Sequence, residues 1–494
     1  MLLLGIDIGT SSVKVSVVDA DQQQVIATAQ YPDTESPILS LQTGWAEQSP
    51  DMWWQQTGQA IALCHQKGGY NPQDIAAIGI AYQMHGLVLV DKDQQVLRDS
   101  IIWCDSRAVK IGDEAFDAIG HEACLSYMLN SPGNFTASKL AWVKKHEPDI
   151  YDKIYKVMLP GDYIAMKLTG DITTSASAMS EGILFDFQIG GLSKDITGYF
   201  GFGDELFPEV RPVFSAHGTV TATVASALQL KEGIPVTYKA GDQPNNALSL
   251  NVLNPGEVAA TAGTSGVIYG VSDQLAYDPQ SRVNTFAHVN HTNEQKRLGV
   301  LLCINGTGSF YRWVKSAFGA HLNYQQMNAE VEKAPLGSDN LRIMPFGNGT
   351  ERMLNNKQIG AQLHNIDLNL HTPAHVFRAA QEGIACAFRY GLDIMRENGM
   401  NPTVIRAGRS SMFLSDVFTQ SFVNATRVPV ELYNNDGSMG AALGAGIGAG
   451  IFANGGEAFG NLKAKHRIEP NTTDFEEVYQ SWKLILDQQL SIIQ

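Results

Sequence analysis

Residues 1–20, MLLLGIDIGTSSVKVSVVDA, place a carboxylate, a glycine and three hydroxyl groups between two apolar segments. The first segment is an almost continuous apolar run, and in the second, from Val13 to Val17, valines alternate with polar residues. This alternation is typical of a half-buried strand. Taken alone, the stretch is compatible with a plain β-hairpin in which Asp7 and Gly9 only shape the turn.

The same pattern recurs about half a chain later. Residues 256–273 read GEVAATAGTSGVIYGVSD, which is again a strand, a Gly-Thr-Ser turn and a strand. Two similar halves in a chain of 494 residues indicate a duplicated domain with a cleft between the copies. Buried strand segments such as Ile75–Tyr82 also alternate with helical segments such as 49–66, which predicts an α/β fold with mixed sheets.

Composition and charge narrow the range of partners. The formal net charge of −15 argues against general binding to nucleic-acid backbones. The five cysteines are scattered without a CxxC pair, which is typical of a reducing cytoplasm, and the N-terminus lacks the basic segment of a signal peptide. The apolar stretch that begins at Gly440 is too short to span a membrane and indicates a buried helix instead. We expect a cytoplasmic protein that binds small molecules, and a homodimer is compatible with the sequence.

The repeated turn has a chemistry of its own. A tight Gly-Thr-Ser turn directs successive backbone N–H groups and hydroxyls toward one point, and such a nest binds anions, most often phosphate. Two nests across a cleft can hold successive phosphates of one nucleotide. The chain contains no Gly-Lys dipeptide, which excludes a P-loop, and it contains no GxGxxG motif. A carboxylate such as Asp7 beside bound phosphates is explained if it faces a divalent cation or its waters.

At this point several motifs resemble the FGGY family of carbohydrate kinases. They are GIDIGTSSVK (5–14), FTASKLAWVKKHEP (135–148), AGDQPNNAL (240–248) and TAGTSG (261–266), and the resemblance extends over essentially the whole chain. Within the family, QMHG (83–86) resembles the xylulose kinase branch. The sequence departs from the family pattern at Asn134, and the family's glycine cluster near the adenine is reduced to Gly408. The resemblance implies two actin-like (ribonuclease H-like) domains, residues 1–247 and 248–494, with ATP, Mg²⁺ and a sugar in the cleft.

The resemblance also implies roles for single residues. Asp242 corresponds to the catalytic general base, and Asp7 lies where it would face Mg²⁺. Met84 and His85 match the sugar-binding Met-His pair, and we expect Trp103 to line the same site. The expected nucleotide contacts are Thr10, Ser11, Gly263, Thr264, Ser265 and Gly408.

Simpler roles stay open for some of these residues. Asp242 also suits an N-cap, because a helix is predicted to begin just after Pro244. Asp105 and Arg107 follow Trp103 and form either a structural ion pair or part of the sugar site.

The activity that the resemblance implies is phosphorylation of a ketose by ATP, with D-xylulose as the first candidate and D-xylulose 5-phosphate as its product. L-Xylulose, ribulose, a seven-carbon ketose and glycerol are alternative acceptors. An actin-like nucleotide switch without catalytic activity is an alternative of a different class, although both Asp7 and Asp242 are present.

Overall fold

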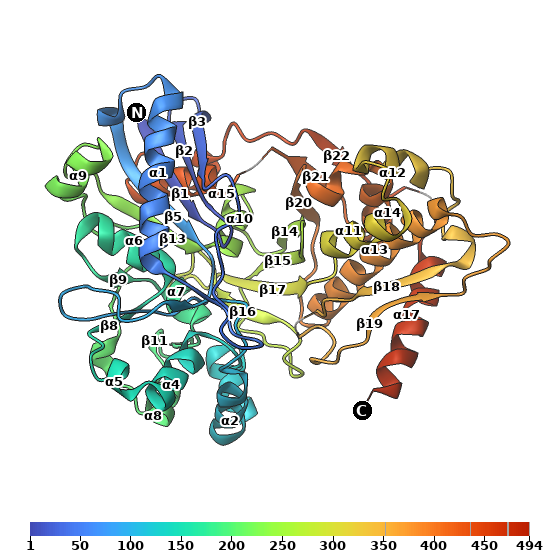
Figure 1. Cartoon of the computed structure of the whole chain (residues 1–494), viewed down its shortest axis with the longest axis horizontal. Helices are drawn as coiled ribbons and strands as arrows, with labels where there is room; N and C mark the ends of the chain where they lie inside the picture. The colour runs from blue at the N-terminus through green and yellow to red at the C-terminus, as the bar shows by residue number, and fades with distance from the viewer. Residues whose placement is uncertain (351, 435, 472–473, 494) are drawn as a thin grey trace.

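The computed structural model describes residues 1–350, 352–434, 436–471 and 474–493. A five-stranded sheet forms the first half of the chain, in the order β13-β5-β1-β2-β3 (Figure 1). β1 pairs antiparallel with β2 and parallel with β5, and β13 continues the parallel side. The strand bounds are Leu2–Ile8 (β1), Val13–Asp19 (β2), Gln24–Tyr31 (β3), Ile75–Tyr82 (β5) and Val236–Gly241 (β13).

The second sheet repeats this arrangement. Its order is β16-β17-β15-β14-β20-β21-β22, and β14 pairs antiparallel with β15 and parallel with β20. The series β21-β20-β14-β15-β17 thus corresponds strand by strand to β13-β5-β1-β2-β3, which confirms the duplication predicted from the sequence. The bounds are Glu257–Ala262 (β14), Gly266–Ser272 (β15), Asn284–Ala287 (β16), Leu298–Ile304 (β17), Val404–Gly408 (β20), Val430–Tyr433 (β21) and His466–Ile468 (β22).

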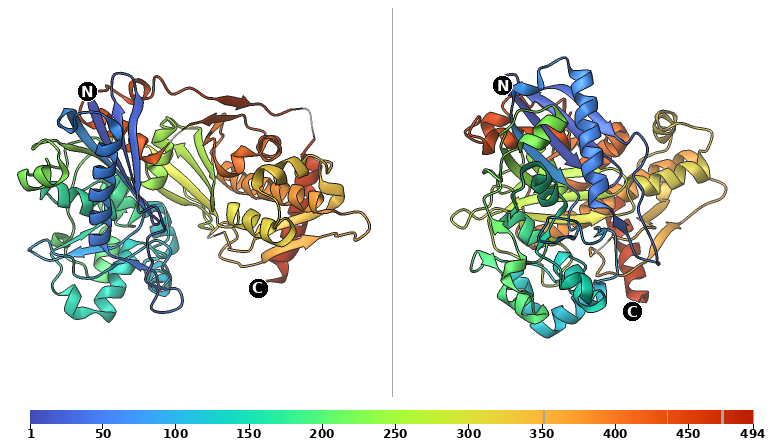
Figure 2. Two further views of the ribbon diagram at one scale, coloured as in Figure 1. Left: turned by 45° about the horizontal axis from the view of Figure 1, so that its top comes forward. Right: turned by 60° about the vertical axis from the view of Figure 1, so that its left-hand side comes forward.

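Helices cover both sheets and extend each lobe (Figure 2). In the first half they are α1 (Pro50–Gly68), α2 (Val109–Ile119), the short α3 (His121–Ala123), α4 (Thr136–His146), the short α5 (Pro148–Tyr151), α6 (Pro160–Thr169), α7 (Ala176–Glu181), α8 (Lys194–Phe200), α9 (Ala222–Leu228) and α10 (Asp242–Ser249). In the second half they are α11 (Gly308–Phe318), α12 (Tyr324–Val331), α13 (Pro373–Glu397), α14 (Asp416–Thr426), α15 (Gly437–Gly448) and α17 (Glu476–Ile492). None of the helices in the described parts of the chain combines the length and apolar character needed to cross a membrane.

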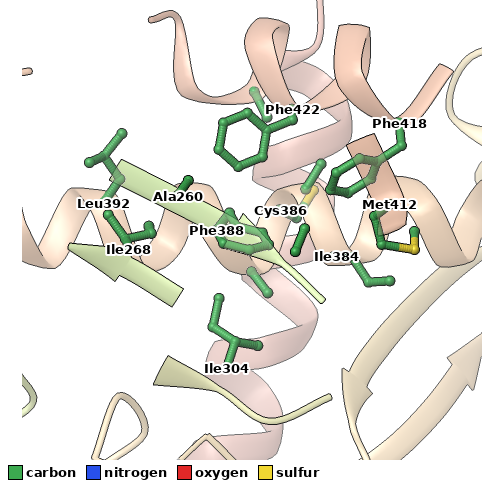
Figure 3. Close-up of a cluster of buried hydrophobic side chains, with 14 of the residues drawn as sticks. Ala260, Ile268, Ile304, Ile384, Cys386, Phe388, Leu392, Met412, Phe418 and Phe422 are labelled. Atoms are coloured by element: carbon green, nitrogen blue, oxygen red, sulfur yellow. The ribbon is translucent and has the colours of Figure 1, made fainter. Parts of the chain in front are cut away.

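The largest core of the second half lies between its sheet and α13. Phe388 and Ile384 of α13 face Ala260, Ile268 and Ile304 of the strands, and aromatic rings of α14 close the cluster from the other side (Figure 3). All of these side chains are buried. This packing fixes the end of β14, from which the second Gly-Thr-Ser turn projects.

Helix α15, the glycine-rich segment near Gly440, packs against the first sheet although it belongs to the second half of the chain. A Cβ atom on Gly5 would lie 1.8 Å from the carbonyl oxygen of Ser438, and one on Gly79 would lie 1.9 Å from that of Ala441. Glycine at both strand positions therefore allows the helix to approach the sheet. The sequence prediction of a buried, closely packed helix is confirmed.

Candidate active site

Asp242 lies directly beyond the carboxyl end of β13, the edge strand on the parallel side of the first sheet, and open α/β sheets place their ligands at such strand ends. Strand β13 ends at Gly241, and Asp242 is the first residue of α10. The interpretation of Asp242 as an N-cap is wrong, because Gly241 occupies that position and the helix begins before Pro244 rather than after it. The half-buried Asp242 thus belongs to the first turn of α10, and β5 separates β13 from β1, the strand that carries Asp7.

The two carboxylates influence each other. The pKa of Asp7 is raised to about 6, first by burial and then by the negative charge of Asp242, against the lowering effect of Lys14. Burial also raises the pKa of Asp242 to about 6, while hydrogen bonds from Gln243 lower it. Each group is therefore largely ionised at pH 7 and is a stronger base than an ordinary carboxylate.

This pair fits the expected Mg²⁺ ion. Magnesium is usually bound by one or two carboxylates together with substrate phosphates and water, rather than by an all-protein cage. Within the described residues, no group of three or more His, Cys, Asp or Glu side chains could hold a metal alone. Asp7 is the better candidate ligand, because it lies two residues before the phosphate nest at Gly9. The N-terminus of α15 also lies next to the Asp7 carboxylate, since a Cβ on Gly437 would lie 2.2 Å from Oδ2 of Asp7.

Met84 and His85 follow β5 directly and lie beside the strand end that carries Asp242. Met84 is buried against Gly241, whose added Cβ would lie 2.6 Å from Cγ of Met84. His85 has a left-handed backbone, with φ 64°, which is uncommon for a residue other than glycine. Its ring packs against Phe135 and Phe286 with centroid distances of 4.8 Å and 5.5 Å. The ring therefore has little freedom to turn.

The protonation of His85 follows from its surroundings. Nδ1 lies 3.0 Å from the carbonyl oxygen of Glu181, so Nδ1 carries the hydrogen and Nε2 is left with its lone pair. The pKa of His85 is lowered to about 3, mainly by burial and then by the charge of Lys139. His85 is thus a neutral imidazole whose Nε2 can accept a hydrogen bond from a sugar hydroxyl.

Glu181 was not anticipated from the sequence. Its carboxyl group is buried, and its Oε1 accepts a hydrogen bond from the Tyr82 hydroxyl at 2.8 Å. Burial raises the pKa of Glu181 well above its usual value, and the charge of Asp242 raises it further. Burial and the charge of Asp242 therefore both favour the neutral form of the Glu181 carboxyl group. No local sequence pattern marks it, because its position depends on the packing of α7 against β16 and β13.

The first Gly-Thr-Ser turn is linked to the sugar side of the site. The Thr10 hydroxyl accepts a hydrogen bond from Nε1 of Trp103 at 2.9 Å and donates one to Oε1 of Gln83 at 3.2 Å. Gln48 donates to the Thr10 carbonyl at 2.8 Å. Trp103 is 44% exposed and lies two residues beyond the short strand β7 (Ser100–Ile101), so it belongs to a loop rather than to a strand end. Ser11 is exposed.

Asp105 and Arg107 point into the protein. Asp105 accepts hydrogen bonds from Nε and Nη2 of Arg107 at 2.9 Å and 2.7 Å, and both side chains are buried. The guanidinium carbon of Arg107 lies 3.8 Å from the ring centroid of Trp45. This geometry supports the structural ion pair, the simpler of the two roles that the sequence left open.

The second turn borders a cavity of ≈ 490 Å³ in the second half of the chain. The amides of Gly308 and Ser309, at the start of α11, donate to the carbonyls of Gly263 and Thr264 at 2.8 Å and 3.0 Å. The volume is in the range of small-molecule sites. The cavity is lined by Gly263, Thr264, Gly308, Ser309, Tyr311, Arg312, Tyr324, Gln325, Asn328, Gln381, Ser411, Met412, Leu414 and Ser415.

Most of these lining residues were missed by sequence reasoning. Only Gly263 and Thr264 were expected; Ser265 is half-buried in the turn, and Gly408 ends β20 without lining the cavity. The run Gly306–Ser309, which reads GTGS, resembles the two turns in composition and is the one signal that could have pointed to α11. The remaining lining residues come from separate helices and loops, so no continuous motif identifies them.

Comparison with known proteins identifies the family. The N-terminal domain of the FGGY family of carbohydrate kinases matches residues 2–249, and the C-terminal domain of that family matches residues 258–451. The chain belongs to the FGGY family of carbohydrate kinases. Both the family and the two-domain α/β fold expected from the sequence are therefore confirmed. The boundary at residues 247/248 and the roles of single residues stay predictions.

Several FGGY relatives are similar over most of the chain. The xylulose kinase of Bacillus subtilis (strain 168) is 30% identical over 451 residues, which covers 89% of this chain and 87% of that protein. The xylulose kinase of Escherichia coli (strain K12) is 29% identical over 460 residues, or 92% and 90% of the two chains. The crystal structure of the xylulose kinase from Rhodospirillum rubrum has a TM-score of 0.90 at 25% identity and covers 100% of this chain and 99% of that chain.

Proposed function

We propose that this FGGY kinase transfers the γ-phosphoryl group of ATP to a ketose, D-xylulose in the first place, and forms D-xylulose 5-phosphate. The observation that carries the proposal is the Met84-His85 pair beside Asp242, at the adjacent ends of β5 and β13. A buried apolar side chain, a neutral hydrogen-bond acceptor and a carboxylate base suit a small polyhydroxylated acceptor. The similarity to relatives named xylulose kinase favours D-xylulose among the ketoses.

In this mechanism Asp242 accepts the proton of the attacking hydroxyl as its oxygen approaches the γ-phosphorus in line. The transition state of phosphoryl transfer is loose, so positioning and neutralisation of charge contribute most of the catalysis. A pKa raised to about 6 leaves Asp242 ionised at pH 7 and well matched to its task as a base. His85 and Met84 hold the sugar so that one hydroxyl points at Asp242.

The two turns divide the phosphate contacts in this proposal. The backbone N–H groups of Thr10 and Ser11 in the first turn face the transferred phosphoryl group, while that of Gly9 donates to the Ser12 carbonyl at 3.0 Å. Asp7 would hold Mg²⁺ through a carboxylate oxygen or a bound water. When bound, the ion neutralises charge on the β- and γ-phosphates. The cavity beside Thr264 and Tyr311 receives the nucleoside, with Thr264 and Ser265 at its phosphate end.

Release of ADP with Mg-ATP across a panel of ketoses, aldoses and polyols tests the proposal. We expect D-xylulose to give the highest kcat/KM. A higher value for glycerol or an aldose than for every ketose would show that the acceptor is assigned to the wrong branch. Absence of turnover with the whole panel, together with tight nucleotide binding, would instead favour the nucleotide switch.

We also propose that the enzyme works in the cytoplasm. All five cysteines are free thiols, and Cys104 is exposed, which suits a reducing compartment. A homodimer stays a prediction from the sequence, and light scattering at several protein concentrations tests it.

A further inference from the structure

Two lysine side chains are fully buried in the first half of the chain, and they differ in their partners. Lys239, on β13, donates to Oδ1 of Asp162 at 2.6 Å and to the carbonyl of Thr173 at 2.6 Å. This is the usual arrangement for a buried cation, since an opposite charge compensates its loss of hydration. Lys139, on α4, is 0% exposed as well.

Lys139 has no carboxylate partner at ion-pair distance among the described residues. Its ammonium group forms no ion pair within 4.0 Å among the residues that the structure describes. Instead Nζ donates to the carbonyl oxygens of His85 at 2.9 Å and Ile102 at 3.0 Å. Burial lowers the pKa of Lys139 to about 7, against the opposing charge of the more distant Asp105. The side chain is thus less well stabilised than Lys239, and its position calls for a reason other than stability.

The two carbonyls that Lys139 holds belong to the two chain segments of the acceptor site. One belongs to His85 itself, whose left-handed backbone must be maintained, and the other belongs to Ile102, directly before Trp103. A non-glycine residue in this backbone region persists only where its surroundings over-determine it. One ammonium group therefore connects the strand end that carries His85 with the loop that carries Trp103.

We propose that Lys139 is a positioning residue for the acceptor sugar, which holds the His85 and Trp103 segments in register through their carbonyl oxygens. The proposal rests on the assignment of His85 to the sugar site. Lys139 does not reach the sugar, because its side chain has no exposed surface. Its effect passes through the main chain of His85, and hence through the direction in which Nε2 presents its lone pair.

Loss of the ammonium would leave neither carbonyl without a donor. The Thr136 hydroxyl also donates to the His85 carbonyl, at 3.3 Å, and the amide of Asp105 also donates to the Ile102 carbonyl, at 3.2 Å. Methionine has nearly the same length as lysine and no charge, so Lys139→Met removes a desolvated cation and creates no orphaned polar group. In contrast, Lys239→Met leaves the buried Asp162 carboxylate without its partner.

These contacts allow a crossed test with two matched variants. For Lys139→Met we expect the Tm to stay within about 2 °C of the parent or to rise, while the KM of the sugar rises about ten- to hundredfold and the KM of ATP changes less than about twofold. For Lys239→Met we expect the Tm to fall by more than about 5 °C with the KM of the sugar unchanged. Thr136→Val, which removes the weaker donor to His85, should raise the KM of the sugar by a smaller factor.

Hydrogen exchange gives a readout that does not depend on which sugar is used. Peptides that contain residues 83–88 and 101–106 should exchange faster in Lys139→Met than in the parent, while peptides of β13 and of α13 should not change. A Lys139→Met protein that loses stability and keeps its KM for the sugar would overturn the proposal, as would unchanged exchange in both peptides. If the parent enzyme uses none of the sugars, the proposed function fails, and the exchange experiment still decides the role of Lys139.

Discussion

The two Gly-Thr-Ser turns share a tripeptide and a strand context, yet the structure gives them different surroundings. The hydroxyl of Thr10 is engaged by Gln83 and Trp103, which belong to the acceptor side. Thr264 is exposed and borders the cavity, and its carbonyl accepts a hydrogen bond from the amide of Ser309 at the start of α11.

The strands that lead into the turns differ as well. Two residues before the first turn stands Asp7, and at the same place before the second turn stands Thr261. The carboxylates of the site, Asp7 and Asp242, are therefore both on the side of the first turn. The two copies of the strand–turn–strand unit have thus diverged: the first follows Asp7 on the side of Asp242, and the second borders a cavity whose lining is largely uncharged and includes Arg312.

The largest expected effect is a loss of kcat on replacement of Asp242, one of the two carboxylates on the side of the first turn. Asp242→Asn should lower kcat by about 10²–10⁴-fold in single-turnover measurements, because an amide does not accept the hydroxyl proton. Sugar binding should weaken only modestly, since the amide oxygen still accepts a hydrogen bond. Asp416→Asn is the matched control, because Asp416 is likewise the first residue of its helix and is exposed. A variant that keeps more than about a tenth of kcat would remove Asp242 from the role of base.

A second expectation concerns the acceptor alone. His85→Ala should reduce kcat/KM for the sugar by about 5- to 150-fold, equivalent to about 1–3 kcal/mol for sugar hydroxyls left unpaired. The KM of ATP should not change, because the cavity beside the second turn contains no part of β5 or of the segment that follows it. Equal losses for sugar and ATP would contradict the division between the two turns.

The pH dependence of activity and of stability tests the role of the Asp242 carboxylate on the side of the first turn. Activity should fall about tenfold per pH unit below about 6, because protonated Asp242 cannot act as the base. The contribution of Asp242 to the stability of the folded protein should instead decrease as the pH rises. A folded-state pKa of about 6 lies above the usual value of the unfolded chain, about 3.9, so the folded protein binds more protons between these values. The contribution of Asp242 to stability is thus fully present below about pH 4 and is lost as the pH rises through 6.

The difference in Tm between Asp242→Asn and the parent isolates this contribution from that of the other carboxylates. The variant should gain in relative stability as the pH rises from 4 to about 7, because it lacks the buried charge. A difference in Tm that does not depend on pH would show that the pKa of Asp242 is not raised in the folded protein.

The smallest effects should distinguish the turns directly. Thr264→Val should raise the KM of ATP by about 2- to 10-fold, the effect of one hydrogen bond to a charged group, and leave the KM of the sugar unchanged. Thr10→Val removes the hydroxyl that links Gln83 to Trp103 and should raise the KM of the sugar as well as that of ATP. Trp103→Phe, which removes the other half of that link, should reproduce the effect on the sugar. Identical profiles for the two threonine variants would mean that the turns have not diverged.

Local chemistry accounts for what the sequence predicted well. The strand–turn–strand units, the helix that begins at Pro50 and the buried strand Ile75–Tyr82 all depend on the periodicity of apolar residues and on turn chemistry. The candidate site residues at strand ends, Asp7, His85 and Asp242, could be proposed for the same reason. Ser49, the first residue of the predicted helical segment 49–66, occupies the N-cap position of α1, although its side chain makes no capping hydrogen bond.

The sequence by itself thus determined that this protein is a duplicated α/β kinase with a carboxylate, Asp242, directly after the end of a strand. Only the tertiary structure decided that the first turn contacts Gln83 and Trp103 and that the second turn borders the cavity. The link from Thr10 to Gln83 and Trp103 joins residues 73 and 93 positions apart, and the packing of α15 on Gly5 and Gly79 joins opposite ends of the chain. Such contacts depend on how whole elements pack, and the local sequence of each turn does not predict which distant residues it contacts.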